Sequence, residues 1–207
     1  MTKNTRVLLA TTNRGKLHEM STILGEPGIR LVTTSDVGID LAVDETGSTY
    51  VDNAVLKARA YAAASGLITL GDDSGLEVDA LDGAPGVRAA RIAGPGATDA
   101  DRYNLLLSKL EGVPADRRTA RFRCAVALAA PAGQLATAEG ACEGRIAFRP
   151  AGKNGFGYDP VFYLDEYGRT MAELPDEIKN TISHRARALK AARPLILAAL
   201  KDWADPH

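Results

Sequence analysis

This chain has few cysteines, few aromatic residues and almost no net charge. The scarcity of cysteine argues against one kind of metal site, and the low net charge argues against two classes of binding partner. Its 207 residues include two cysteines and 5% aromatic residues, and the formal net charge is −1. Cys124 and Cys142 form neither a CxxC pair nor a Cys/His cluster, so we expect two buried thiols and no zinc site. The balanced charge gives no global electrostatic reason to bind nucleic acid or an anionic membrane.

Long apolar runs are missing as well. No stretch approaches the ~18 apolar residues of a transmembrane helix. The N-terminal stretch "MTKNTRVLLATTNRGK" has too short an apolar run for the core of a signal peptide. We therefore expect no membrane segment and a cytoplasmic location. The chain is long enough for one sizeable domain over 1–207. Its content of 45% hydrophobic residues is ordinary for a globular protein.

What is present is a regular succession of apolar segments separated by turn formers. We expect strands over 6–13, 29–35 and 67–73, alternating with helices over 14–24, 49–66 and 97–112. Later strands run consecutively, over 119–130, within 133–148 and within 154–164. This order predicts an α/β protein with a mixed central sheet, flanking helices, and two lobes with a cleft between them.

Helix boundaries are marked by capping residues. Thr49 with Asp52, and Thr98 with Asp101, form capping-box patterns that predict two helix starts. We expect a C-terminal helix to begin at Ser183, and Pro194 to kink or split it.

Two adjacent acids, Asp72 and Asp73, come where the apolar run of "LITLGDDSG" gives way to turn formers. Like charges placed there repel unless one is protonated, one turns to solvent, or a cation binds. Side chains alternate along a strand, so we expect only one of the two on a given face. The other could bond to turn backbone, with Ser74 and Gly75 completing the bend. A hard cation such as Mg²⁺ takes carboxylate oxygens and shares substrate phosphates.

Four further clusters carry groups that could bind a ligand. In "ATTNRGK" a strand enters a polar turn at a helix start, which suits an anion, although the Walker A spacing is absent. Asn53 and Lys57 lie four residues apart on one helical face. "GKNGFGYDP" offers backbone access, aromatic faces and an acceptor. The cations of "SHR" at a helix start favour an anion or an acceptor-rich ligand.

Each cluster also has a structural alternative: a solvated turn, solvated charges, a hairpin aromatic or a packed histidine. Together the clusters supply carboxylates for a metal, lysines for phosphates and a glycine-aromatic loop for a base. That combination is typical of a nucleoside triphosphate site.

The blocks "ATTNRGK", "DETG", "NAVLKAR", "DDSGLEVDAL", "GAPGV", "GFGYDP" and "SHRARAL", in this order, resemble the Ham1/RdgB family of inosine and xanthosine triphosphate pyrophosphatases. The resemblance extends from Val7 to about Leu200. Thr12 is a departure, because the family commonly has glycine there. The resemblance implies a two-lobed α/β fold and a homodimer. It also implies Mg²⁺-dependent cleavage of dITP, ITP and XTP between the α- and β-phosphates, which releases the monophosphate and pyrophosphate.

The resemblance also implies roles for particular residues. Mg²⁺ is assigned to Glu45 and Asp73, with Asp73 as the proton acceptor. Asp72 is a supporting or alternative acid and a further candidate ligand of the metal. The triphosphate is assigned to Thr11, Thr12, Asn13, Arg14, Gly15 and Lys16, with Lys57 stabilising the departing pyrophosphate and Ser74 contacting substrate. The base and sugar are assigned to Phe156, Gly157, Tyr158, Asp159, Lys179, His184 and Arg185. Donors near Ser183 would match the 6-keto oxygen of hypoxanthine or xanthine and leave adenine unpaired.

Three other functions compete with this one. A related pyrophosphatase could act on dTTP or UTP. A nucleotide-binding sensor could have lost catalysis, although the retained acids at 45, 72 and 73 argue against decay. A nucleic-acid-binding module would need a basic stripe, and the local candidate is Arg117, Arg118, Arg121 and Arg123.

Overall fold

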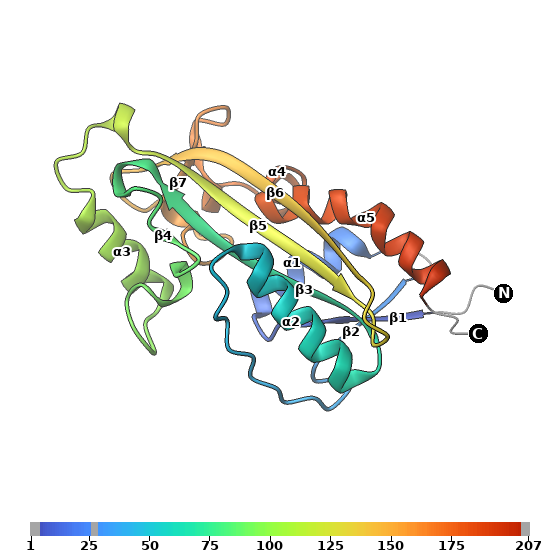
Figure 1. The fold of residues 1–207 in the computed structure, drawn as a ribbon. Helices are drawn as coiled ribbons and strands as arrows, with labels where there is room; N and C mark the ends of the chain where they lie inside the picture. Colours follow the sequence, from blue (N-terminus) through green and yellow to red (C-terminus); the bar gives the residue numbers. More distant parts are fainter. Residues whose placement is uncertain (1–4, 26–28, 204–207) are drawn as a thin grey trace. The chain divides into compact units, whose positions relative to one another are not determined.

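The computed structural model describes residues 5–25 and 29–203. Over these residues, eight strands form one sheet in the order β2-β1-β3-β5-β6-β7-β8, with β4 beside β3 (Figure 1). The strands are β1 (Thr5–Leu9), β2 (Ile29–Thr33), β3 (Ile68–Val78), β4 (Pro85–Gly86), β5 (Thr119–Ala129), β6 (Leu135–Ile146), β7 (Phe162–Leu164) and β8 (Arg169–Thr170). β1 pairs in parallel with β2 and β3, whereas β3–β4, β6–β7 and β7–β8 are antiparallel. The sheet is therefore mixed, as predicted.

Five α-helices flank the sheet within the described part of the chain. They are α1 (Arg14–Leu24), α2 (Tyr50–Ser65), α3 (Asp99–Lys109), α4 (Asp176–Ile182) and α5 (His184–Asp202). Short 3₁₀ turns are η1 (Asp79–Leu81), η2 (Ala89–Arg91), η3 (Ala115–Arg117), η4 (Asp159–Val161) and η5 (Met171–Glu173). The α/β class with flanking helices, predicted from the sequence, is confirmed.

The chain divides into two compact units. Unit 1 comprises the chain up to Asp73, Cys124–Gly140 and the chain from Arg185; unit 2 comprises Ser74–Arg123 and Ala141–His184. The strands β3, β5 and β6 each contribute residues to both units. Two lobes were predicted, and the cleft between them stays a prediction.

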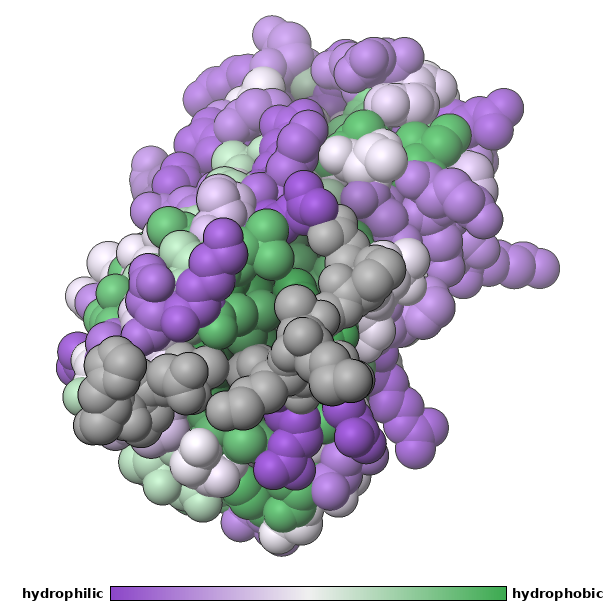
Figure 2. Space-filling view, turned by 90° about the vertical axis from the view of Figure 1, so that its right-hand side faces the viewer, coloured by the Kyte–Doolittle hydropathy of each residue, from purple (hydrophilic) through white to green (hydrophobic). Residues whose placement is uncertain are grey.

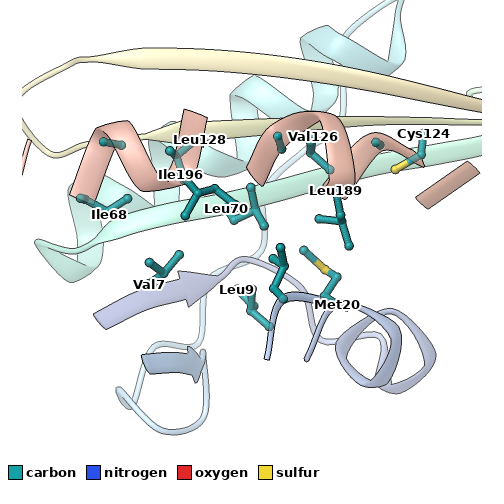
Figure 3. Packing of buried hydrophobic residues seen from close by; sticks show 14 of the residues in the cluster. Val7, Leu9, Met20, Ile68, Leu70, Cys124, Val126, Leu128, Leu189 and Ile196 are labelled. Atoms are coloured by element: carbon teal, nitrogen blue, oxygen red, sulfur yellow. The ribbon is translucent and has the colours of Figure 1, made fainter. Parts of the chain in front are cut away.

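In unit 1, helices cover both faces of the parallel strands. On one face, side chains of α1 and α5 pack against alternate residues of β1, β3 and β5, as Figure 3 shows for Val7, Leu9, Met20, Ile68, Leu70, Val126, Leu128, Leu189 and Ile196. On the other face, Leu8 and Val32 pack against Tyr61 of α2. Strands buried on both sides read as continuous apolar runs, and "VLLA" is such a run.

In unit 2, the core gathers aromatic and aliphatic side chains from strands, 3₁₀ turns and α3. Phe122 of β5 and Phe162 of β7 lie with ring centroids 4.4 Å apart, and Leu106 of α3 is fully buried in the same cluster. Tyr158 belongs to this cluster too. The loop that carries Tyr158 is therefore held by the core on one side.

The predicted helix starts are confirmed. Thr49 accepts a hydrogen bond from the Asp52 N–H at 3.1 Å, and the Asp52 carboxylate accepts one from the Thr49 N–H at 3.1 Å. Thr98 and Asp101 form the same capping box at α3. Gly66 ends α2 in the left-handed conformation, with φ 66°.

The end of one strand and the expected break in the C-terminal helix differ from the sequence predictions. The strand expected over 67–73 continues through the paired acids to Val78, so Asp72 and Asp73 lie inside β3 rather than in a turn. Pairing with β4, at Leu76 opposite Gly86, keeps this segment extended despite its turn-forming residues. α5 begins at His184, directly after Ser183, and runs through Pro194 without being split.

No described helix is long and apolar enough to cross a membrane. Hydrophilic residues cover much of the face in Figure 2, and apolar residues are visible in several separate places on it.

Candidate functional site

The adjacent acids of β3 point to opposite faces of the strand. On the face covered by α1 and α5, the Asp72 Oδ2 atom lies 3.0 Å from Lys16 Nζ and 3.3 Å from both Nε and Nη2 of Arg185. On the α2 face, Asp73 accepts a hydrogen bond from Asn53 Nδ2 at 3.0 Å and lies 3.8 Å from Lys57 Nζ. The expectation that only one acid faces a given side is confirmed.

The two carboxyl groups consequently titrate differently. Burial by itself would raise the pKa of Asp72, but the Lys16 ammonium and the Arg185 guanidinium outweigh it and hold that pKa below its ordinary value. Burial also raises the pKa of Asp73, where Lys57 and Asn53 only partly oppose it. Asp72 therefore stays ionised to lower pH than Asp73 does, and Asp73 is the better proton acceptor of the pair.

Glu45 joins Asp73 through a shared cation. Lys57 Nζ donates to Glu45 Oε1 at 2.7 Å and also faces the Asp73 carboxylate. Burial lowers the pKa of Lys57, but the surrounding carboxylates, Asp72 and Asp73 first, reverse the effect and raise it. Glu45 and Asp73 thus converge on one position that favours positive charge.

Close packing between α2 and β3 brings these groups together. A Cβ atom at Gly71 would lie 2.7 Å from the Ala54 carbonyl oxygen and 2.8 Å from the Ala58 nitrogen. Glycine at this position allows the helix to approach the strand directly beside the acids. Asn53 and Lys57, one helical turn apart on α2, then both reach Asp73.

The turn between β1 and α1 has the form expected for an anion site. Asn13 caps α1 by accepting from the Lys16 N–H at 3.0 Å, and Thr11 Oγ1 accepts from the Asn13 N–H at 3.2 Å. Thr12, Asn13 and Arg14 are exposed, while Thr11, Gly15 and Lys16 are half-buried. The Lys16 side chain extends from this helix start to Asp72. The predicted phosphate segment is thus adjacent to the acid pair within unit 1.

A second set of predicted residues lies in unit 2. Asp159 Oδ2 accepts from the Phe156 N–H at 2.8 Å and from Lys179 Nζ at 2.5 Å. The Lys179 ammonium also lies 4.8 Å from the centroid of the Phe156 ring. A Cβ atom at Gly155, where φ is 73°, would lie 2.1 Å from the Asp159 carboxylate, so this turn requires glycine. Phe156 is therefore held in place by a buried ion pair.

Other predicted site residues make contacts within unit 2. Tyr158 is buried and donates to the Ala89 carbonyl at 2.7 Å, and burial raises its pKa to about 12. His184 is buried and stacks on Phe122, with ring centroids 4.7 Å apart. The Gly157 N–H donates to Asp99 at 2.7 Å, and Ser74 is a half-buried residue of β3. Their roles toward a substrate stay predictions.

Arg185 was predicted to surround the base, and the structure places it in unit 1. Its side chain is 1% exposed, and its guanidinium binds the carboxylates of Glu19 and Asp72. Sequence reasoning missed Glu19, Asp99 and the full role of Asn53. A helical acid such as Glu19, three residues after Lys16, gave no local signal because its partner is far away in the chain.

The oxygen ligands suit Mg²⁺ better than a softer metal. Among the described residues, no group of three or more His, Cys, Asp or Glu side chains could hold a metal ion. Two carboxylates, Glu45 and Asp73, nevertheless share one cationic neighbour in Lys57. Mg²⁺ commonly takes one or two carboxylates and completes its shell with water and substrate phosphates. These residues therefore fit Mg²⁺, whereas Asp72 faces two protein cations and its assignment to the metal stays a prediction.

The arginine cluster does not form a basic stripe. Arg118 is buried and donates to the carbonyl oxygens of Leu110, Ile146 and Ala147. Arg121 pairs with Asp79 and Glu143. These contacts favour a structural role for the cluster.

The chain is similar to known proteins in both sequence and structure. The Ham1 family model matches residues 7–195. A protein named dITP/XTP pyrophosphatase from Desulforamulus reducens is 51% identical over 191 residues, which cover 92% of this chain and 95% of that protein. A Ham1 protein from Coxiella burnetii has a TM-score of 0.85 at 42% identity, over 94% of this chain and all of that one. A nucleoside-triphosphatase, or dITP/XTP pyrophosphatase, from Mycobacterium abscessus has a TM-score of 0.73 at 46% identity, over 91% of this chain and 99% of that one. A match this long, joined to the acid pair and its lysines, shows that the chain belongs to the Ham1 family.

Proposed function

We propose that this protein is a nucleoside triphosphate pyrophosphatase that removes dITP, ITP and XTP from the nucleotide pool. The observation that carries the proposal is the convergence of Glu45 and Asp73 on one cationic position, beside Lys57. A triphosphate needs a metal and several ammonium groups to offset its charge. Unit 1 supplies two carboxylates that fit a metal, and the ammonium groups of Lys16 and Lys57. The relatives named dITP/XTP pyrophosphatase support the choice of substrate.

The chemistry assigned to unit 1 is hydrolysis between the α- and β-phosphates. Water attacks the α-phosphorus, and Asp73, whose pKa burial raises, accepts the proton. Lys16 and Lys57 stabilise negative charge on the departing pyrophosphate. Mg²⁺ bound by Glu45 and Asp73 would supply further charge neutralisation at the phosphates. Most of the acceleration comes from positioning and electrostatics, as in other phosphoryl transfers.

The chemistry assigned to unit 2 is recognition of the base, by resemblance to the family. The Phe156 ring offers a flat face, and its position is set by the Asp159–Lys179 ion pair. Stacking on an aromatic ring contributes about 1–3 kcal/mol per base and tolerates any purine. Discrimination therefore requires hydrogen-bond donors that match a 6-keto oxygen and leave the 6-amino group of adenine without a partner.

A nucleotide panel tests the proposal. Purified protein is incubated with dITP, ITP, XTP, GTP, ATP, dTTP and UTP, with and without Mg²⁺, and pyrophosphate and phosphate are measured separately. We expect Mg²⁺-dependent pyrophosphate release from dITP, ITP and XTP, with far less from ATP. Asp73→Asn serves as the inactive control. Equal rates with ATP and ITP would refute the base assignment, and phosphate as the primary product would refute the bond assignment.

We also propose a homodimer and a cytoplasmic location, on the resemblance to the family. Light scattering coupled to size-exclusion chromatography tests the first, and cell fractionation tests the second. A monomer over a wide range of concentration would refute the dimer.

A further inference from the structure

Asn53 uses both ends of its side chain to join two parts of the acidic site. The residue is fully buried in the first turn of α2. Its Nδ2 atom donates to Asp73 Oδ2 at 3.0 Å, and its Oδ1 atom accepts from the Gly47 N–H at 2.8 Å. One amide group therefore links strand β3 to the loop that contains Glu45.

The loop depends on this contact for its position. Gly47 follows Glu45 by two residues, and a Cβ atom at Gly47 would lie 2.7 Å from Asn53 Oδ1 and 2.5 Å from Asp52 Cβ. Only glycine allows the loop to lie this close to the start of α2. Glu45 then reaches Lys57 at 2.7 Å. The distance between the Glu45 and Asp73 carboxylates is thus set partly by the Asn53 amide.

The chemistry of an amide suits this place better than the alternatives. The neutral N–H donor of Asn53 orients the Asp73 carboxylate without cancelling its charge. It binds Asp73 Oδ2 and leaves Asp73 Oδ1 facing Lys57. Aspartate has no donor for Asp73 when ionised and would repel it. An aliphatic side chain would leave both the Gly47 N–H and an oxygen of Asp73 without this partner.

We propose that Asn53 is a positioning residue for the metal ligands: it orients Asp73 and anchors the loop of Glu45, and so sets the affinity of the site for a divalent cation. The inference rests on the proposed function. Residues that orient metal ligands commonly change metal affinity by about 10–100-fold when they are replaced. We expect a loss in this range for Asn53 variants.

The test measures Mn²⁺ binding by electron paramagnetic resonance, with no nucleotide present. Asn53→Ala and Asn53→Asp remove the donor to Asp73, and Gly47→Ala displaces the loop while it keeps that donor. Asp52→Ala is the matched control, because Asp52 is the adjacent, exposed capping residue and its carboxylate accepts hydrogen bonds from Ser48 and Thr49. Circular dichroism and thermal unfolding establish that each variant folds.

We expect Asn53→Ala, Asn53→Asp and Gly47→Ala each to weaken Mn²⁺ binding at least tenfold, and to raise the Mg²⁺ concentration needed for half-maximal turnover. Asp52→Ala should lose thermal stability but keep the wild-type affinity. Wild-type affinity in the folded Asn53 and Gly47 variants would overturn the inference, as would an equal loss in Asp52→Ala. A wild-type protein that binds no Mn²⁺ would overturn it too, whereas pyrophosphate release from the nucleotide panel tests the proposed function separately.

Discussion

Replacing Arg185 by methionine removes a buried guanidinium from between two carboxylates. The Arg185 side chain is 1% exposed, and those of Asp72 and Glu19 are 0% and 6% exposed. Water therefore cannot solvate the two anions when their cation is removed. Methionine is similar in length to the aliphatic part of arginine, so the change tests charge more than packing.

The size of the expected loss in stability follows from the burial of the Arg185 ion pairs. Breaking a buried ion pair by removing one partner costs about 3–5 kcal/mol, because the remaining charge is uncompensated. For a protein of this size, 1 kcal/mol corresponds to about 2–4 °C in Tm. We therefore expect Arg185→Met to lower the free energy of unfolding by about 3–5 kcal/mol and Tm by roughly 6–20 °C. Lys16, which also contacts Asp72, places the effect toward the lower end of these ranges.

Urea unfolding at pH 7, followed by circular dichroism, measures the effect. Arg187→Met is the matched control, because Arg187 is exposed on the same helix. Adding Glu19→Gln to Arg185→Met should recover part of the loss, since one of the two uncompensated charges is then removed. A loss below about 1 kcal/mol in Arg185→Met, similar to that of a surface substitution, would refute the reasoning.

Three further predictions concern the acids and a thiol. Burial opposes ionisation of Asp72, but two neighbouring cations lower its pKa, so its contribution to stability is present above an unfolded pKa of about 4 and is lost as pH falls below it. The difference in unfolding free energy between wild type and Asp72→Asn should thus shrink between about pH 5 and pH 2, and a constant difference would contradict this. Asp73→Asn should reduce kcat by at least about 100-fold with a much smaller change in nucleotide affinity, measured by steady-state kinetics and calorimetry; near-normal turnover at saturating Mg²⁺ would count against Asp73 as the proton acceptor. Burial raises the pKa of Cys124 to about 12, so mass spectrometry should find Cys124 unmodified by a thiol reagent in the folded protein and modified after denaturation; rapid labelling of the folded protein would be inconsistent with that environment.

Local features of the fold could be read from the sequence. Helix α1 occupies 14–24 as predicted, and the Thr49–Asp52 capping box starts α2 where it was expected, because capping depends on residues only three positions apart. The end of β3 was missed. Asp, Ser and Gly favour turns locally, and only the pairing with β4 keeps 74–78 extended.

The site was predictable to the extent that its residues form short motifs. Lys16, Lys57, Glu45 and the two acids of β3 lie within unit 1. Their contacts form two groups on opposite faces of β3: Lys16 with Asp72, and Lys57 with Glu45 and Asp73. The Glu19–Arg185 contact joins residues 166 positions apart, and no local pattern indicates it. The bond from Asn53 to Asp73 spans 20 positions, so the helical spacing of Asn53 and Lys57 suggested a shared face but not what that face binds.

The acids of β3 restrict the length of this strand as well as its composition. Neighbouring residues of a strand point in opposite directions, so a slip of one position exchanges the two sides. A one-residue insertion directly before Asp72 would turn Asp72 toward the face of Asn53 and Lys57, and Asp73 toward the face of Arg185. The carboxyl group with the lowered pKa and the one with the raised pKa would exchange faces, although every side chain was still present. Evolution and protein engineering are therefore constrained in the number of residues of this segment as well as in its side chains.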